Sequence, residues 1–178
     1  WDTPALECTL GGLVLEFTGE SVVALSGANM NATLNELPLS LYSPISISAG
    51  DRLKLGQARI GMRCYIAFAG GIAGSNFLGS VSTHIPARLG GVEGRALSAG
   101  DHINALAQPV GTPIDVPPYL RTPISHDWFL RALPGPEYKN FSDEARRQFF
   151  SDGFTVDRRA DRMGIRLTGM TLQTPETP

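Results

Sequence analysis

The sequence is poor in cysteine, in long apolar runs and in excess charge of either sign. It has 178 residues and only two cysteines, Cys8 and Cys64. Two cysteines do not make a disulfide framework, and both lie among apolar residues, so we expect buried free thiols. The longest apolar stretch, 65–73, is far shorter than the roughly 18 residues that a membrane-spanning helix needs. With a net charge of −2, the sequence favours neither nucleic acid nor a membrane as partner, and we expect a cytoplasmic protein.

Motifs of several common enzyme classes are also missing. The sequence has no Walker A loop, no G-x-S-x-G motif and no Met-Lys-Met biotin-acceptor motif. The glycines of 90–95 ("GGVEGR") do not match the dinucleotide-binding pattern, and no helix is expected after them. The three histidines, His84, His102 and His126, lack metal-ligand spacing. We therefore predict no metal site and no biotin attached to this chain.

Glycine and proline are abundant, with 20 and 13 residues. Their spacing predicts short strands rather than long helices. We expect a turn at Asn35-Glu36 and, as the clearest hairpin, 44–56 with its turn at 49–51. Further strands are expected at 12–17, 21–27, 61–71, 128–135, 153–157 and 164–172.

One convincing helix is expected, over 142–153. Ser142 is a suitable N-cap, and Asp143 and Glu144 suit the first turn. Gly153 lies where the helix should end.

The chain should divide into three parts. Residues 1–107 are expected to form a β-barrel. Five prolines in 108–128 predict a linker over 108–127. Residues 128–178 would then be a smaller α+β segment, so the predicted class is mainly β.

The stretch 74–100 is rich in glycine and serine and is long for a loop in a compact domain. It contains three basic side chains: His84, Arg88 and Arg95. A floppy surface excursion is one interpretation, but a binding loop on a rigid scaffold explains the basic residues better.

Three blocks in this region carry a resemblance: "GMRCYIAFAGGI" (61–72), "LGSVST" (78–83) and "GGVEGRALSAGD" (90–101). They resemble the core of the biotin-dependent carboxyltransferase-like family. This family includes the C subunit of 5-oxoprolinase, the antagonist of a sporulation kinase inhibitor, and the carboxyltransferase region of urea carboxylase. Flanking blocks agree and follow the family's order: "ALECTLGG" (5–12), "ALSGAN" (24–29), "RALPGPEY" (131–138) and "DRMGIRLTG" (161–169).

The resemblance implies a fold, an activity and partners. The fold would be a cyclophilin-like β-barrel. The activity would be ATP-dependent opening of 5-oxoproline to glutamate, by a complex that includes a B subunit and an A subunit. Two alternatives remain: carboxyl transfer from carboxybiotin in a urea carboxylase or allophanate hydrolase system, and a non-catalytic regulator that binds a kinase inhibitor.

The sequence departs from the family pattern in two ways. Family segments that would precede and follow these blocks are not found, so the resemblance implies a chain truncated at both ends and inactive alone. Family members commonly have an aspartate after Ile72, where this chain has Ala73. A carboxylate role at that position is therefore not expected.

In both chemistries an oxygen gains negative charge and needs positioned donors. Glycine-rich turns bring backbone N–H groups close to an anion, and arginine grips an anion with two parallel hydrogen bonds. The predicted catalytic residues are Arg95, Arg63 and Ser80. The predicted substrate-binding residues are Gly70, Gly71, Gly79, Ser82, Thr83, Asp161 and Arg162.

Each of these residues also has a structural explanation. The glycines and hydroxyls could simply form turns, and either arginine could make a structural salt bridge. The tetrapeptide "SAGD" occurs twice, at 48–51 and at 98–101, and Asp101 is its last residue in the second copy. This repeat favours a turn role for Asp101. Asp161 and Arg162 could line a site or fix a turn.

Overall fold

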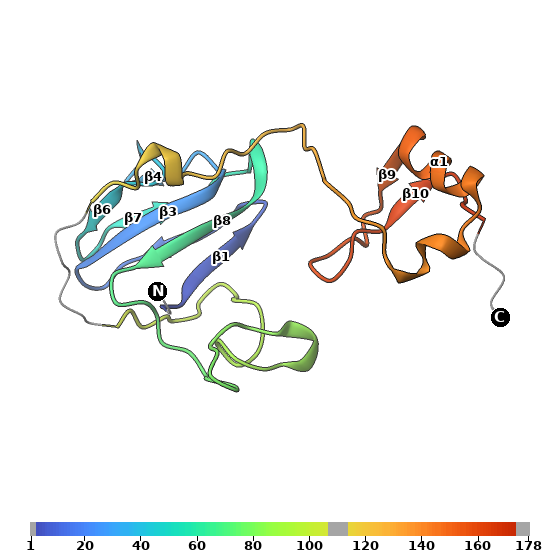
Figure 1. The fold of residues 1–178 in the computed structure, drawn as a ribbon. Helices are drawn as coiled ribbons and strands as arrows, with labels where there is room; N and C mark the ends of the chain where they lie inside the picture. Colours follow the sequence, from blue (N-terminus) through green and yellow to red (C-terminus); the bar gives the residue numbers. More distant parts are fainter. Residues whose placement is uncertain (1–2, 107–113, 174–178) are drawn as a thin grey trace. The chain divides into compact units, whose positions relative to one another are not determined.

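The computed structural model describes residues 3–106 and 114–173. Contacts divide the chain into two compact units, Trp1–Trp128 and Phe129–Pro178 (Figure 1). No helix in the described ranges is long and apolar enough to cross a membrane.

The first unit is built from two antiparallel sheets. One sheet has the order β1-β8-β3-β6, formed by Ala5–Thr9, Ile60–Phe68, Ser21–Asn29 and Pro44–Ile47. The other has the order β2-β7-β4-β5, formed by Val14–Glu16, Arg52–Lys54, Thr33–Leu34 and Leu37–Pro38. The segments that run from one sheet to the other are held by backbone hydrogen bonds. Examples are the bonds from Gly12 N to Leu55 O (3.1 Å) and from Gly56 N to Met30 O (2.8 Å).

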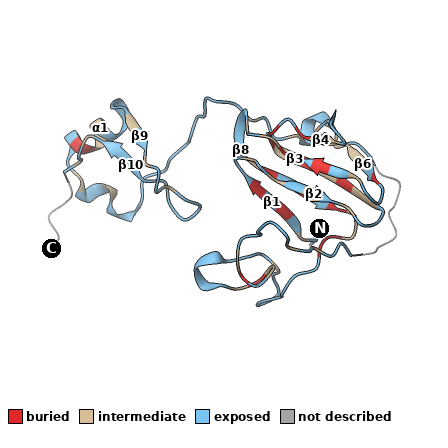
Figure 2. Ribbon diagram, turned by 180° about the vertical axis from the view of Figure 1, so that it is seen from behind, coloured by how far each residue is buried: buried red, intermediate tan, exposed pale blue. Residues whose placement is uncertain are grey.

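The hydrophobic core is formed mainly by residues of these strands, and Figure 2 shows buried positions in red along β1 and β3. Burial alternates along β1 and along the second half of β8, as expected for strands with one covered face. The largest fully buried side chains are Leu25, Met30, Leu53, Leu55, Ile66, Val23 and Cys64. The mainly β fold class expected from the glycine and proline spacing is thereby confirmed.

The hairpin expected over 44–56 is only partly correct. Its turn is present: Asp51 N donates to Ser48 O at 3.1 Å, and Gly50 has a φ of 88°. However, β6 pairs with β3, and β7 pairs with β2 and β4. Ile47 and Leu53 are both buried, so the turn leads the chain from one sheet to the other around the core.

The turn at Asn35-Glu36 is confirmed. It joins β4 to β5, and both residues have positive φ, 51° and 65°. Two successive positive φ values give the twist that a two-residue hairpin needs.

The described part of the predicted linker packs on the barrel. Val116 N donates to Tyr42 O at 2.9 Å, and the Arg121 guanidinium lies 5.6 Å from the centre of the Tyr42 ring. The Tyr42 hydroxyl donates to Thr122 O at 3.4 Å. A short 3-10 helix, η2 (Pro118–Leu120), lies in the same stretch. The beginning of the predicted linker, 108–113, falls outside the described residues.

Among its described residues, the second unit has one α-helix and a two-stranded sheet. Helix α1 spans Asp143–Ser151, and Ser142 Oγ accepts a hydrogen bond from Ala145 N at 3.1 Å. This confirms the predicted helix and its N-cap. Strands β9 (Phe154–Val156) and β10 (Leu167–Gly169) pair antiparallel, and the 3-10 helix η3 (Pro136–Asn140) precedes α1.

The strand expected at 128–135 is wrong. This stretch has neither helix nor strand, and every residue in it is exposed. A strand exists only where a neighbour accepts and donates its backbone hydrogen bonds. No such neighbour lies beside it among the described residues, although its composition suits a sheet.

Candidate functional site

The predicted site begins where β8 ends. Gly70 and Gly71 follow this central strand with φ values of 82° and 83°. The Gly71 amide donates back to Phe68 O at 2.8 Å. A Cβ on Gly71 would lie 3.0 Å from Thr3 Cβ and 3.1 Å from Pro4 Cδ. Glycine is thus required here both for the turn and for close packing against the N-terminal segment.

The following stretch, 73–101, is a folded loop held by its own hydrogen bonds. Isolated bridges connect Ser75 to Gly91, Phe77 to Ser80 and His84 to Leu89. The 3-10 helix η1 (Ile85–Ala87) starts at His84, whose Nδ1 accepts from Ala87 N at 3.2 Å. The loop is therefore a structured platform rather than a floppy excursion.

Several predicted backbone donors are already used inside this loop. The Gly79 amide donates to Asn76 Oδ1 at 3.0 Å, and the Ser80 amide to Phe77 O at 3.1 Å. The Ser82 amide donates to Ser80 Oγ at 3.1 Å. These amides fix the turn, and the Ser80 hydroxyl oxygen takes part in it as an acceptor.

The glycines of 90–94 are explained by packing. A Cβ on Gly90 would collide with Ser82 O, and one on Gly91 would collide with Thr83 Oγ1. A Cβ on Gly94 would collide with the backbone of Arg88. All three glycines have positive φ. Thr83 is therefore held against Gly91, which fixes the position of its hydroxyl in the loop.

Arg95 is held at the end of the loop by two carboxylates. Its Nη1 lies 2.7 Å from Asp101 Oδ2 and its Nη2 lies 3.0 Å from Asp101 Oδ1. Its Nε donates to Glu93 Oε2 at 3.0 Å, and Nη1 also donates to Ala96 O at 3.1 Å. The hydrogen bonds to Asp101 and then to Glu93 raise the pKa of Arg95 above its usual value. Since Asp101 and Glu93 neutralise the guanidinium, the geometry favours the structural explanation of Arg95, as a clasp that closes the loop.

The two SAGD turns have the same geometry. Asp51 Oδ2 accepts from Ser48 N at 2.7 Å, and Asp101 Oδ2 accepts from Ser98 N at 2.7 Å. Each carboxylate then binds a side chain elsewhere, Asn35 for Asp51 and Arg95 for Asp101. The turn role expected for Asp101 is therefore present in the structure.

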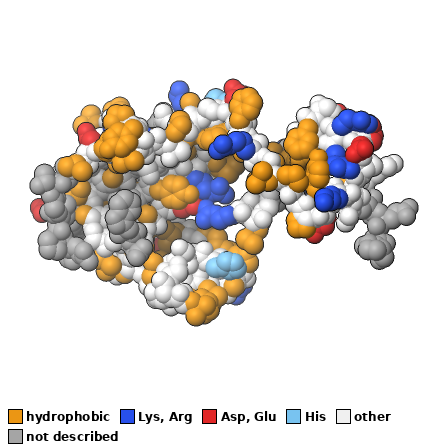
Figure 3. Space-filling model, viewed as in Figure 1, with side chains coloured by type: hydrophobic (Ala, Val, Ile, Leu, Met, Phe, Trp, Pro, Cys, Tyr) orange, Lys and Arg blue, Asp and Glu red, His pale blue; other side chains and the backbone are white. Residues whose placement is uncertain are grey.

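Arg63 lies on the outward face of β8. Its Nε is 3.3 Å from Glu7 Oε1 on β1, yet this buried nitrogen makes no hydrogen bond of good geometry in the described residues. The side chains are half-buried, 33% and 29% exposed. Arg63 is therefore less firmly held by its acidic neighbour than Arg95. Charged side chains gather in the middle of the visible face of the first unit (Figure 3).

Asp161 and Arg162 lie in the other unit, in the connection between β9 and β10. Asp161 Oδ1 accepts from Met163 N at 2.8 Å and from Gly164 N at 3.1 Å. The Asp161 carboxylate thus fixes a turn. The structure brings Gly79, Ser80, Ser82, Thr83 and Arg95 into one loop, with Gly70, Gly71 and Arg63 on the strand and turn that lead into it.

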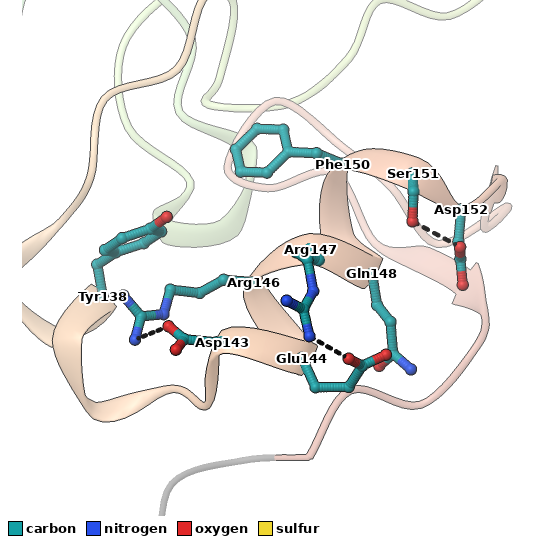
Figure 4. A pocket seen from close by; sticks show the side chains of 9 residues that line it. All are labelled: Tyr138, Asp143, Glu144, Arg146, Arg147, Gln148, Phe150, Ser151 and Asp152. Atoms are coloured by element: carbon teal, nitrogen blue, oxygen red, sulfur yellow. Dashed lines mark hydrogen bonds and ion pairs between the residues drawn. The ribbon is translucent and has the colours of Figure 1, made fainter.

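A pocket of about 840 Å³ lies along α1 in the second unit (Figure 4). It is lined by Tyr138, Asp143, Glu144, Arg146, Arg147, Gln148, Phe150, Ser151 and Asp152. The sequence patterns did not indicate this pocket, although the helix and its acid–arginine spacing of three residues can be read from the sequence. Arg146 pairs with Asp143 at 2.9 Å and Arg147 with Glu144 at 2.7 Å. The four charged side chains at the start and middle of α1 are therefore paired with one another.

Among the described residues, no group of three or more His, Cys, Asp or Glu side chains is arranged to hold a metal ion.

The comparisons with known proteins place this architecture in a family. The family model for the carboxyltransferase domain, subdomain A and B, matches residues 1–177. The chain belongs to this carboxyltransferase-domain family, as the three sequence blocks indicated.

Relatives of two kinds are similar to the chain. The C subunit of the Escherichia coli 5-oxoprolinase is 36% identical over 97% of this chain, and that of Haemophilus influenzae is 33% identical over 97%. The crystal structure of the K. lactis urea amidolyase matches with a TM-score of 0.86 and 34% identity over 94% of this chain, and 11% of that protein. The chain spans about half the length of the two 5-oxoprolinase relatives, 54% in both cases.

Proposed function

We propose that this chain is part of a multi-subunit 5-oxoprolinase that opens 5-oxoproline to glutamate with ATP. The observation that carries the proposal is the 36% identity to the C subunit of the E. coli 5-oxoprolinase, over 97% of the chain. The proposed partners are a B subunit, which shares the active site, and an A subunit. The proposed location is the cytoplasm.

Within this complex the proposed contribution of the chain is the 73–101 loop. Opening a lactam places negative charge on the carbonyl oxygen, which positioned donors must stabilise. The Ser80 hydroxyl can donate from a fixed turn, and Thr83 is held firmly by its contact with Gly91. Arg63 supplies positive charge on the strand that leads into the loop. Arg95 acts through the loop as a positioning residue.

The predicted anion donors of the 73–101 loop do not form a phosphate cradle. A phosphate cradle needs several free amides beside positive charge. The amides of Gly79, Ser80 and Ser82 are all used inside the loop, and Arg95 is neutralised. ATP is therefore assigned to the complex as a whole.

A urea carboxylase role is the second candidate, because the K. lactis urea amidolyase shares the fold with a TM-score of 0.86. In that case the chain would work with carboxybiotin carried by another polypeptide. The same donors would then stabilise the oxygen of the acceptor amide.

One assay separates these candidates. The full-length protein is combined with its B and A partners, and 5-oxoproline with ATP is supplied. Formation of glutamate and ADP in equal amounts, lost when this chain is left out, is the expected result. Release of ADP that requires bicarbonate, biotin carrier and urea would instead assign the carboxylase role. Full activity of the partners without this chain would contradict both and favour a regulator.

A further inference from the structure

The segment 116–124 is attached to the first unit at two separate points. At the first point, Val116 N donates to Tyr42 O at 2.9 Å, and the Arg121 guanidinium lies over the Tyr42 ring. Arg121 Nε also donates to Val116 O at 2.8 Å, which closes the segment into a compact turn around the 3-10 helix η2. These contacts all lie inside the first unit, so they depend on no other part of the chain.

The second point of attachment is the start of β8. A Cβ on Gly61 would lie 2.9 Å from Ile124 Cγ2 and 3.1 Å from Ala28 Cβ. The Ile124 side chain therefore occupies space that a larger residue at position 61 would need. Ala28 is fully buried, with an exposed fraction of 0%. Ile124 is thus packed against the barrel at a position where glycine leaves room for it.

Tyr42 has a backbone conformation that bulky residues rarely adopt. Its φ is 69°, in the left-handed region that favours glycine. Such strain persists only where the surrounding contacts hold the residue in place. Tyr42 N donates to Leu25 O on β3 at 2.8 Å, while its carbonyl, ring and hydroxyl contact the segment 116–124. An aromatic residue at this strained position is explained by its contacts with the segment.

These two attachments limit the length of chain that can bend between the units. The first unit ends at Trp128 by its contacts, and its last packed side chain in the described part of this stretch is Ile124. The first helix of the second unit is η3, which begins at Pro136. The chain that can bend between the two units is therefore 125–135 at most.

We propose that 116–124 is a strap that holds the chain to the barrel and thereby shortens the tether between the two units. A tether over 108–135 would reach roughly 100 Å when extended, whereas one over 125–135 reaches roughly 40 Å. A short tether keeps the second unit available to the first at an effective concentration on the order of millimolar. The strap is thus a conformational device that limits how far the units can separate. It is independent of the proposed 5-oxoprolinase activity.

The first test is limited digestion of the intact chain with trypsin, which cleaves after arginine. With the strap docked, the bond between Arg121 and Thr122 should be cut slowly. Gly61→Ala should displace Ile124 and speed this cleavage about tenfold. Gly50→Ala is the matched control, since Gly50 also has a positive φ, 88° against 81° for Gly61, but a Cβ there meets nothing within 4 Å. The control should leave the cleavage rate unchanged.

The second test removes the other attachment and follows amide exchange by mass spectrometry. Tyr42→Gly keeps the positive φ and both backbone hydrogen bonds but removes the ring and the hydroxyl. Exchange across 116–124 should become about tenfold faster, while exchange in β8 should stay the same because the barrel remains folded. Tyr42→Phe keeps the ring and should retain the protection of 116–124.

Three results would overturn the proposal. The first is fast exchange across 116–124 in the original chain, which would show a free linker and decides the matter even where a variant fails to fold. The second is equal cleavage after Arg121 in Gly61→Ala and Gly50→Ala, which would show that the packing of Ile124 holds nothing. The third is unchanged exchange in Tyr42→Gly.

Discussion

Arg95 and Asp101 face each other through two parallel contacts, 2.7 Å for Nη1–Oδ2 and 3.0 Å for Nη2–Oδ1. This is a bidentate pair, in which two guanidinium N–H groups donate to the two oxygens of one carboxylate, so it fixes both the distance and the orientation of the side chains. It joins the end of the glycine-rich stretch to the second SAGD turn. The clasp explains why the loop is ordered and gives the first prediction.

Arg95→Ala and Asp101→Ala should lower the activity of the full complex to a similar extent, because each opens the same clasp. The double variant should be no worse than either single one. Arg95→Lys should restore activity only in part, since an ammonium cannot make both parallel bonds. Steady-state kinetics of the complex and melting temperature of the chain are measured together.

A different pattern would return Arg95 to the catalytic role predicted from the sequence. If Arg95 bound the substrate, Arg95→Ala would lower the rate about 30- to 1,000-fold with an unchanged melting temperature. Asp101→Ala would then have a smaller effect.

Acid should weaken the fold through Asp101. The hydrogen bonds from Arg95 and then from Ser98 lower the pKa of this carboxyl from 3.8 to about 2. A carboxyl with a lowered pKa stabilises the folded state above its unfolded pKa, and that contribution is lost as pH falls toward 2. Urea unfolding at about pH 5 and about pH 2.5 should show a smaller difference for Asp101→Asn than for the original chain.

The matched control for the acid experiment is Asp115→Asn. Asp115 is exposed and makes no ion pair to a described residue. This substitution should leave the pH dependence unchanged. An equal loss of pH dependence in both variants would contradict the role of the Arg95 contact.

The two thiols should be unreactive in the folded chain. Cys8 and Cys64 are opposite one another on β1 and β8, 8% and 0% exposed. Burial first, and then the neighbouring Cys8, raise the pKa of Cys64 to about 11. At about pH 8 we expect no reaction with a thiol reagent in the native state and reaction of both thiols after unfolding in urea. Rapid labelling of the native chain would show that β1 opens from the sheet.

Two glycines of the loop should differ sharply when changed to alanine. Gly79 and Gly91 both have positive φ, 82° and 55°. A Cβ on Gly79 meets nothing within 4 Å, whereas one on Gly91 collides with Thr83 Oγ1. Gly79→Ala should therefore cost only the backbone strain, about 1 kcal/mol, and Gly91→Ala should cost clearly more. Urea unfolding and amide exchange across 73–101 measure this, and equal effects would contradict the packing of Thr83 on Gly91.

The sequence by itself determined the helix and the turns, because each of these depends on residues only a few positions apart. Ser142 with its acidic first turn specified α1, because a helix cap depends on residues only three positions apart. The Asn35-Glu36 turn and both SAGD turns were equally local. The spacing of glycine and proline indicated the mainly β class, and the sequence blocks in their shared order indicated the family.

The tertiary structure decided which strands pair and which charges are neutralised. β6 and β7 follow one another, yet the core separates them into two sheets, which no local pattern shows. The segment 128–135 had the composition of a strand but has no neighbouring strand among the described residues, and a strand forms only where another strand pairs with its backbone. Arg95 and Arg63 looked alike as candidate anion clamps. The folded structure distinguishes them by their acidic neighbours. Arg95 is bound by Asp101 and Glu93 at 2.7 and 3.0 Å, whereas Arg63 lies 3.3 Å from Glu7.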